Sequence, residues 1–277
     1  MKIKLFSYNV VDTPIHRLSG VTKLGSFLFL SFAVMFSYDI RVVLAIMLFS
    51  LGVFKVSKIK FSQVKAMLIY VLIFLVTNAL ITFLFEPEYG VKIYGTRHEI
   101  IHLVGRYRLT WEQLFYQNTK IFKYVAVIPF GIVFLLTTNP SEFGASLNSI
   151  GVNYKVAYAV TLTLRYFPDV QRDYHNISQA QQARGLEMSK KSSLFKRFKN
   201  ALIIIIPLIF SAIDRVESIS NAMDLRGFGK GKKRSWYNKG KMTLQDYTAL
   251  TISILILITT ILISVFVNKS RFFNPFI

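Results

Sequence analysis

An uncharged apolar run from Ala66 to Phe85 constrains this chain more than any other stretch of its sequence. A helix needs about 20 predominantly apolar residues to cross the hydrocarbon core of a bilayer, and runs of this length do not belong to a soluble domain. Further runs are long enough or nearly so, and we expect spans near residues 21–38, 40–56, 66–85, 121–138 and 244–267. The sequence therefore predicts an all-α integral membrane protein with about five transmembrane helices.

Three features of these runs and of the segments between them lead to further predictions. Asp39 and Arg41 favour a tight turn between two helices over one long bent helix. Pro129 lies within the fourth run, where its missing N–H should bend or break the helix. Residues 86–118 are polar with mixed charge, and fragments such as Val91–Gly95 alternate between apolar and polar side chains. In that loop we expect short strands or an irregular lid rather than a helix.

The charge distribution predicts the orientation in the membrane. The chain has a net charge of +20, and residues 139–242 hold 17 Lys and Arg against 7 Asp and Glu. Because cytoplasmic loops are enriched in Lys and Arg, we expect the N-terminus, the connector 55–65 and residues 139–242 inside, and residues 86–118 outside. A nucleic-acid binder could be equally basic but would not carry several membrane-length runs. We therefore expect a bacterial plasma membrane, a lipid bilayer as partner and no nucleic acid.

Candidate catalytic chemistry is sparse. The chain has no cysteine, which excludes disulfides and thiolate metal sites, and it has no Gly-rich phosphate loop, so we do not expect the chain itself to bind ATP. The sharpest pattern is H-E-x-x-H at His98, Glu99 and His102. On a helix both histidines would bind zinc and the glutamate would act as general base. A membrane-embedded zinc metalloprotease is therefore an alternative function, although the segment is short and no third ligand is obvious.

One short pattern occurs twice, 42 residues apart, because residues 177–185 and 219–227 both read Ile-Ser-x-Ala-x-x-x-Arg-Gly. On a helix the isoleucine, alanine and arginine share one face, and the glycine is the usual helix stop because it adopts the left-handed conformation at little cost. The arginine then complements the helix dipole in the last turn. Capping alone would explain one copy, but two matched copies favour two docking points for a partner protein. These docking points consist of Ala183, Arg184, Gly185, Leu225, Arg226 and Gly227.

The apolar run at residues 201–213 lies between the two copies and is too short to span a bilayer. Pro207 lies in its middle, and a crossing there would place the two Arg-Gly ends on opposite sides of the membrane. We therefore expect a helix at the membrane interface or on a partner, and five spans rather than six. An apolar stripe in a cytoplasmic segment needs a partner, and the candidate contact residues are Leu202, Ile205, Leu208 and Ile209.

Several stretches resemble the transmembrane T component, of the EcfT/CbiQ type, of energy-coupling factor (ECF) transporters. The strongest similarity runs from Leu-Arg-Tyr-Phe-Pro at residues 164–168 to Ala-Gln-Gln-Ala-Arg-Gly at residues 180–185. Residues 12–24, 108–110 and 137–140 are similar as well, so the resemblance covers nearly the whole chain in order. The second copy departs from the commoner Ala-Arg-Gly by carrying Leu225, but it keeps the arginine and the glycine.

The resemblance implies a non-catalytic subunit of an importer. Two cytoplasmic ABC-type ATPases would bind ATP and magnesium, a membrane S component would capture a vitamin or a metal ion, and this chain would bind no cofactor and join them. Residues 139–242 would form a cytoplasmic coupling domain with two long helices, between a membrane domain, 1–138, and a last transmembrane helix with its tail, 243–277. Arg184 and Arg226 would each dock on one ATPase, and the apolar face near 202–210 would contact the S component.

A third hypothesis is an ordinary ABC permease with its own translocation path. Transporters that move ions by themselves usually carry acidic pairs or chains of ionisable residues deep in their spans. Here Lys123 and Asp246 are expected near span ends. The membrane part is therefore expected to be a scaffold rather than an ion pathway.

Overall fold

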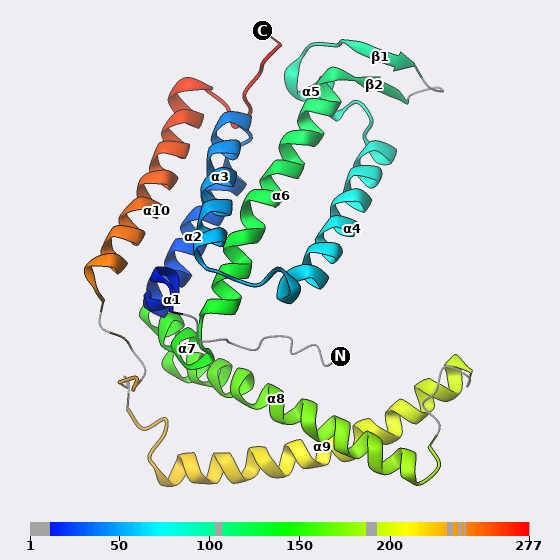
Figure 1. Ribbon diagram of the computed structural model, residues 1–277, viewed down its shortest axis with the longest axis vertical. Coiled ribbons are helices and arrows are strands. Elements are labelled where there is room, and N and C mark those ends of the chain that lie inside the picture. The colour runs from blue at the N-terminus through cyan, green and yellow to red at the C-terminus, as the bar shows by residue number, and fades with distance from the viewer. Residues whose placement is uncertain are drawn as a thin grey trace. The chain divides into compact units, whose positions relative to one another are not determined.

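The computed structural model describes residues 12–102, 107–186, 193–231, 235–237, 240 and 242–276. Within these residues the chain is built almost entirely from helices, with a small two-stranded hairpin (Figure 1). It divides into two compact units, residues 1–139 with 240–277, and residues 140–239. The predicted all-α class is confirmed. The first eleven residues, on which part of the predicted orientation rests, lie outside the described part of the chain.

The first unit packs around one long helix, α6. Its helices are α1 (Pro14–Arg17), α2 (Gly20–Phe36), α3 (Ile40–Val56), α4 (Phe61–Phe85), α5 (Tyr89–Tyr94), α6 (Trp111–Thr137) and α10 (Leu244–Leu262), the last continued by the π-helix η1 (Ile263–Val267). A buried apolar cluster joins α2, α3 and α6 through Leu30, Ala33, Val34, Ile46, Ala126 and Phe130. The core therefore lies between these three helices, while α10 packs on α2.

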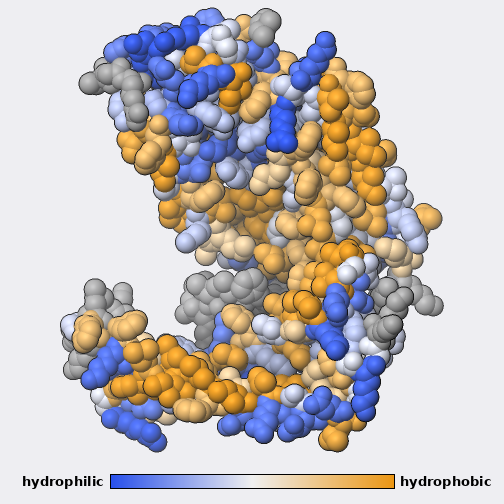
Figure 2. Space-filling model, turned by 180° about the vertical axis from the view of Figure 1, so that it is seen from behind, coloured by the Kyte–Doolittle hydropathy of each residue, from blue (hydrophilic) through white to orange (hydrophobic). Residues whose placement is uncertain are grey.

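Within the described residues, three helices are long and apolar enough to cross a membrane: α4, α6 and α10 with η1. Helices α2 and α3 have 17 residues each, so the number of spans stays a prediction. In Figure 2 the sides of these helices are hydrophobic, and hydrophilic side chains gather at the end that carries the β-hairpin. The apolar sides of these helices suit contact with the hydrocarbon core of a bilayer.

Asp39 separates α2 from α3, as the charged pair predicted. Its fully buried carboxylate accepts hydrogen bonds from the Arg41 backbone N–H at 2.9 Å, from the Arg41 guanidinium at 2.8 Å and from Asn268 at 2.9 Å. Burial alone would raise the pKa of Asp39, but these hydrogen bonds outweigh it and hold the pKa below its usual value. The carboxylate therefore begins α3 and ties it to the segment after η1.

The loop before α6 contains the short strands that were predicted, but also a helix that was not. Residues 91–95 do not form a strand, because α5 covers most of them and ends at Tyr94, with Gly95 as its C-cap at φ +72°. Strand β1 (Glu99–His102) pairs antiparallel with β2 (Arg108–Thr110), and α6 begins directly afterwards, ten residues before the predicted span. Gly90 lies against the backbone of Glu112, where a Cβ would approach to 2.5 Å. This contact with α6 is not local and overrides the alternating pattern.

Helix α6 runs without interruption through Pro129 and contains Lys123 well inside it. The expectation that Lys123 lies near a span end is therefore wrong. Its side chain is buried, and its ammonium donates to the Met35 carbonyl at 3.0 Å and lies 3.3 Å from the centre of the Tyr38 ring. The last carbonyls of a helix have no partner within that helix. Lys123 therefore donates to one of the last carbonyls of α2, which have no partner within that helix.

The second unit contains α7 (Pro140–Ser149), α8 (Tyr154–Ala183) and α9 (Leu194–Leu225). Helices α8 and α9 have 30 and 32 residues and cross each other (Figure 1). Gly144 lets α7 approach α8 closely, because a Cβ there would lie 1.7 Å from the Thr161 hydroxyl. After α9, Phe228 packs on Tyr154 and Tyr158 with ring centroids 5.7 Å and 4.8 Å apart. The chain therefore returns from the end of α9 to the beginning of α8.

Candidate functional site

The two Arg-Gly ends have the same backbone geometry. Helix α8 ends at Ala183 with Arg184 at the C-cap, and Gly185 follows with φ +89°. Helix α9 ends at Leu225, and Gly227 has φ +66°. Positive φ is cheap only for glycine, so the predicted helix stop is confirmed at both copies.

The hydrogen bonds at the two ends also match. In each copy the arginine N–H donates to the alanine carbonyl four residues earlier at 3.3 Å, and the glycine N–H donates at 2.9 Å to the carbonyl three residues earlier. The next N–H, of Leu186 or Phe228, reaches the carbonyl five residues earlier at 3.0 Å or 2.9 Å. This is the Schellman arrangement, in which backbone N–H groups cap the last carbonyls. Neither arginine side chain is therefore needed to stop its helix.

Both arginines lie at the surface, as docking requires. Ala183, Arg184, Leu225 and Arg226 are all exposed, and Leu225 is 90% exposed. A large apolar side chain this exposed at a helix end is a natural contact for another protein. The structure therefore presents all six predicted residues at two helix ends without burying the arginines.

A hollow of about 430 Å³ lies beside the second end. Ile219 and Ala222 of α9 and Arg226 just after its end all line it, so the three residues of the pattern do share one face. Arg165 of α8 lines it from the other side. None of the described residues that line the hollow is acidic. Two guanidinium groups around one hollow favour an acidic ligand group from a partner, since arginine binds carboxylates through two parallel hydrogen bonds.

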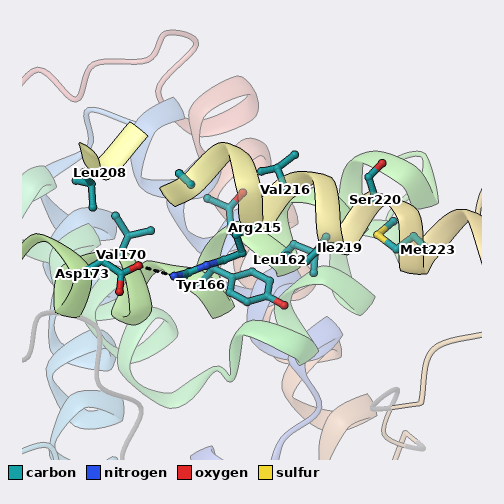
Figure 3. Close-up of a pocket in the computed structure, with 12 residues that line it drawn as sticks. Leu162, Tyr166, Val170, Asp173, Leu208, Arg215, Val216, Ile219, Ser220 and Met223 are labelled. Atoms are coloured by element: carbon teal, nitrogen blue, oxygen red, sulfur yellow. Dashed lines mark hydrogen bonds and ion pairs between the residues drawn. The ribbon is translucent and has the colours of Figure 1, made fainter. Parts of the chain in front are cut away.

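A second groove, of about 320 Å³, runs between α8 and α9 and is mostly apolar (Figure 3). Arg215 reaches across it from α9 and forms an ion pair with Asp173 of α8. Both side chains are about 30% exposed, and the Arg215 guanidinium lies 5.9 Å from the centre of the Tyr166 ring. Sequence reasoning missed this pair, although one signal was present: its two residues are 42 apart, which is the spacing of the repeat.

The apolar face of α9 is exposed over most of the predicted contact. Leu202, Ile205 and Ile209 are 43%, 38% and 51% exposed, whereas Leu208 is half-buried and lines the groove against α8. Figure 2 shows a continuous hydrophobic strip along this part of the helix. Further exposed residues extend it, namely Ile203, Ile206, Phe210, Ile213 and Val216. Three of the four predicted residues therefore lie on one exposed surface and the fourth faces its neighbouring helix.

The H-E-x-x-H pattern does not form the helical zinc site that it would need. Glu99 and His102 lie on strand β1, and Glu99 pairs with Arg108 at 2.7 Å and with Arg97 at 2.8 Å. The His98 Nδ1 lies 2.6 Å from Glu112. The ring stacks on Phe276. Among the residues that the structure describes, no group of three or more His, Asp or Glu is placed to hold a metal ion. The protease alternative therefore loses its geometric basis.

Comparisons with known proteins agree with this geometry. A family model described as cobalt transport protein, CbiQ, matches residues 12–237. The chain is 25% identical over 251 residues to the energy-coupling factor transporter transmembrane protein EcfT of Streptococcus thermophilus, which covers 86% of this chain and 89% of that protein. It is 24% identical over 253 residues to EcfT of Bacillus subtilis, with coverages of 88% and 91%. The chain therefore belongs to the CbiQ family of transmembrane T components of energy-coupling factor transporters.

Proposed function

We propose that this chain couples two ABC-type ATPases to a membrane S component, with Arg184 and Arg226 as the two docking points. One observation carries the proposal: two helix ends of the same sequence pattern have the same capping hydrogen bonds and each exposes one arginine. Two equal ends are what two related ATPase subunits would require. ATP and magnesium belong to those ATPases in this scheme, and this chain is non-catalytic.

The chemistry of docking follows from the guanidinium group. It forms two parallel hydrogen bonds with a carboxylate, and burying that pair in an interface strengthens the attraction. The positively charged hollow beside Arg226, which Arg165 also lines, suits an acidic residue of one ATPase. Gly185 adds no side chain beside Arg184, and no neighbouring atom lies within 4 Å of where its Cβ would be. A partner's backbone can therefore come close to the first end.

The two long helices provide the path for the motion. At 1.5 Å per residue, α8 and α9 are about 45 Å and 48 Å long. ATP-driven closure of the two ATPases would move the two Arg-Gly ends relative to each other, and rigid helices would carry that displacement to their other ends. The exposed apolar strip around Leu202, Ile205 and Ile209 is the proposed contact with the S component. That component would bring in a vitamin or a metal ion, with the N-terminus of this chain and the helices α8 and α9 on the cytoplasmic side of the cell membrane.

Capture of the ATPases tests the proposal. The native chain, Arg184→Ala, Arg226→Ala and the double variant are each co-expressed with the two ATPases and purified through this chain. Truncating one partner of a buried charged pair costs about 2–5 kcal/mol, so each single variant should weaken capture by roughly 30-fold or more. Arg172→Ala is the matched control, because Arg172 is another exposed arginine of α8 outside the pattern. Equal capture by the native chain and the double variant would refute the docking role.

A further inference from the structure

An ion pair between α8 and α9 joins two residues that are separated by the spacing of the sequence repeat. Three pairs of residues line the groove from opposite helices, and the members of each pair are 42 positions apart: Tyr166 with Leu208, Val170 with Ala212, and Asp173 with Arg215. The same spacing separates Arg184 from Arg226. Of these pairs, Asp173 and Arg215 are in direct contact, as an ion pair across the groove (Figure 3).

Contact between equivalent residues of a repeat indicates where a two-fold axis passes. When a two-fold axis relates two surfaces, equivalent residues meet each other only close to the axis. The Asp173–Arg215 ion pair therefore marks a local pseudo-two-fold axis through the crossing of α8 and α9. Arg184 follows Asp173 by 11 residues and Arg226 follows Arg215 by 11. Each arginine consequently lies about 16 Å along its helix from the ion pair, so the crossing has two arms of equal length.

The ion pair fixes the register in which α8 and α9 cross, which the apolar contacts cannot do. Apolar packing is non-directional, so Tyr166, Val170, Leu208 and Ala212 would also tolerate a crossing displaced by one helical turn. A carboxylate and a guanidinium meet only in one register, and the Tyr166 ring lies next to the guanidinium. Charges at these positions therefore select one crossing point among several that apolar packing would accept.

The pair also fixes the rotation of each helix about its axis. Tyr166, Val170, Asp173 and Ile177 follow one another at spacings of four, three and four residues, so they form one stripe along α8. Ala180 and Arg184 continue that stripe at the same spacings, and the equivalent residues do so on α9. Locking Asp173 against Arg215 therefore also sets the direction in which each arginine leaves its helix.

We propose that the Asp173–Arg215 ion pair is the pivot that sets the crossing of α8 and α9, and with it the spacing and direction of the two Arg-Gly ends. Its importance for coupling rests on the proposed docking of those ends. Its effect on the helix pair does not, because the crossing belongs to this chain alone.

The distance between the two helix arms tests the pivot. The chain has no native cysteine, so Gln179→Cys and Asn221→Cys give two unique sites for spin labels. Both positions are exposed, and they are equivalent in the repeat. The full-length protein in lipid nanodiscs is measured by double electron–electron resonance as the native pair, as Asp173→Arg, as Arg215→Asp, and with both changes together. Because the two sites are related by the pseudo-two-fold axis, the double exchange restores an ion pair at the same place.

We expect each single reversal to shift the distance by about one helical turn, roughly 5 Å, or to add a second population, and the double exchange to return the native distribution. The control exchanges Asp169 and Arg172, which form an ion pair within α8 alone, and should change nothing. If a charge reversal prevents folding, Asp173→Asn and Arg215→Gln should broaden the distribution instead.

An unchanged distance in the single variants, or a double exchange that behaves like them, would overturn the pivot. Because this measurement needs no ATPase, it separates the pivot from the docking proposal. Capture of the ATPases by the native chain, lost in the Arg184→Ala and Arg226→Ala double variant, would support docking whatever the distances show.

Discussion

Asp246 joins two helix beginnings, and its removal should destabilise the first unit strongly. The carboxylate is fully buried and accepts hydrogen bonds from the Ser19 N–H at 2.7 Å, the Thr243 N–H at 2.8 Å and the Thr243 hydroxyl at 2.7 Å. Ser19 is the N-cap of α2 and Thr243 is the N-cap of α10. One side chain therefore satisfies orphan donors at both helix N-termini, where negative charge is also favoured by the helix dipoles.

The size of the destabilisation follows from the buried backbone N–H groups that Asp246→Ala leaves without an acceptor. Each backbone N–H that is buried without an acceptor costs about 1–3 kcal/mol, and two are orphaned. Allowing for relaxation, we expect a loss of about 3–5 kcal/mol in the free energy of unfolding. At roughly 3 °C per kcal/mol, the apparent Tm should fall by about 10 °C. Asp246→Asn keeps one acceptor oxygen and should cost less than half as much.

Thermal unfolding of the purified chain in detergent, followed by fluorescence of its two tryptophans, measures this loss. Gln245→Ala is the matched control, because Gln245 is the neighbouring residue on α10 but is exposed. That substitution should change the free energy of unfolding by less than about 0.5 kcal/mol. If Asp246→Ala unfolds at the same temperature as Gln245→Ala, the reasoning from orphaned donors is wrong.

Two further predictions concern the packing of α7 and the beginning of α3. Gly144→Ala places a Cβ 1.7 Å from the Thr161 hydroxyl, so it should separate α7 from α8 and increase amide hydrogen exchange in α7, and adding Thr161→Ala should reverse part of that increase. The pKa of Asp39 is lowered on folding from 3.8, so its ionised form adds stability above that pH, and this stability is lost as the pH falls through the lower folded pKa. The Tm of the native chain should therefore fall more steeply below pH 4 than the Tm of Asp39→Asn, and parallel curves would contradict this.

The sequence predicted those elements whose signals are local. The helix α3 begins and ends where its apolar run does, and both Arg-Gly ends stop at glycine, because an apolar run and a left-handed glycine act on their own residues. The beginning of α6 was missed because its first turns are polar. Lys120 donates to the Thr82 hydroxyl at 2.9 Å and Lys123 to the Met35 carbonyl at 3.0 Å, so neighbouring helices satisfy its charges. Counting apolar residues along one segment cannot detect such partners.

The candidate site was predictable at its ends and not at its centre. Arg184 and Arg226 stand out because the repeat marks them, whereas Asp173 and Arg215 resemble ordinary surface charges until the two helices are laid across each other. The repeat spacing then has a counterpart in space, because Asp173 and Arg215, which are 42 residues apart, form an ion pair at the crossing, and the two arginines 42 apart lie at the ends of its arms. In the proposed docking, a chain that presents the same group to two related ATPases would need equal arms and a fixed crossing, and two helices joined through equivalent residues of a repeat would provide both.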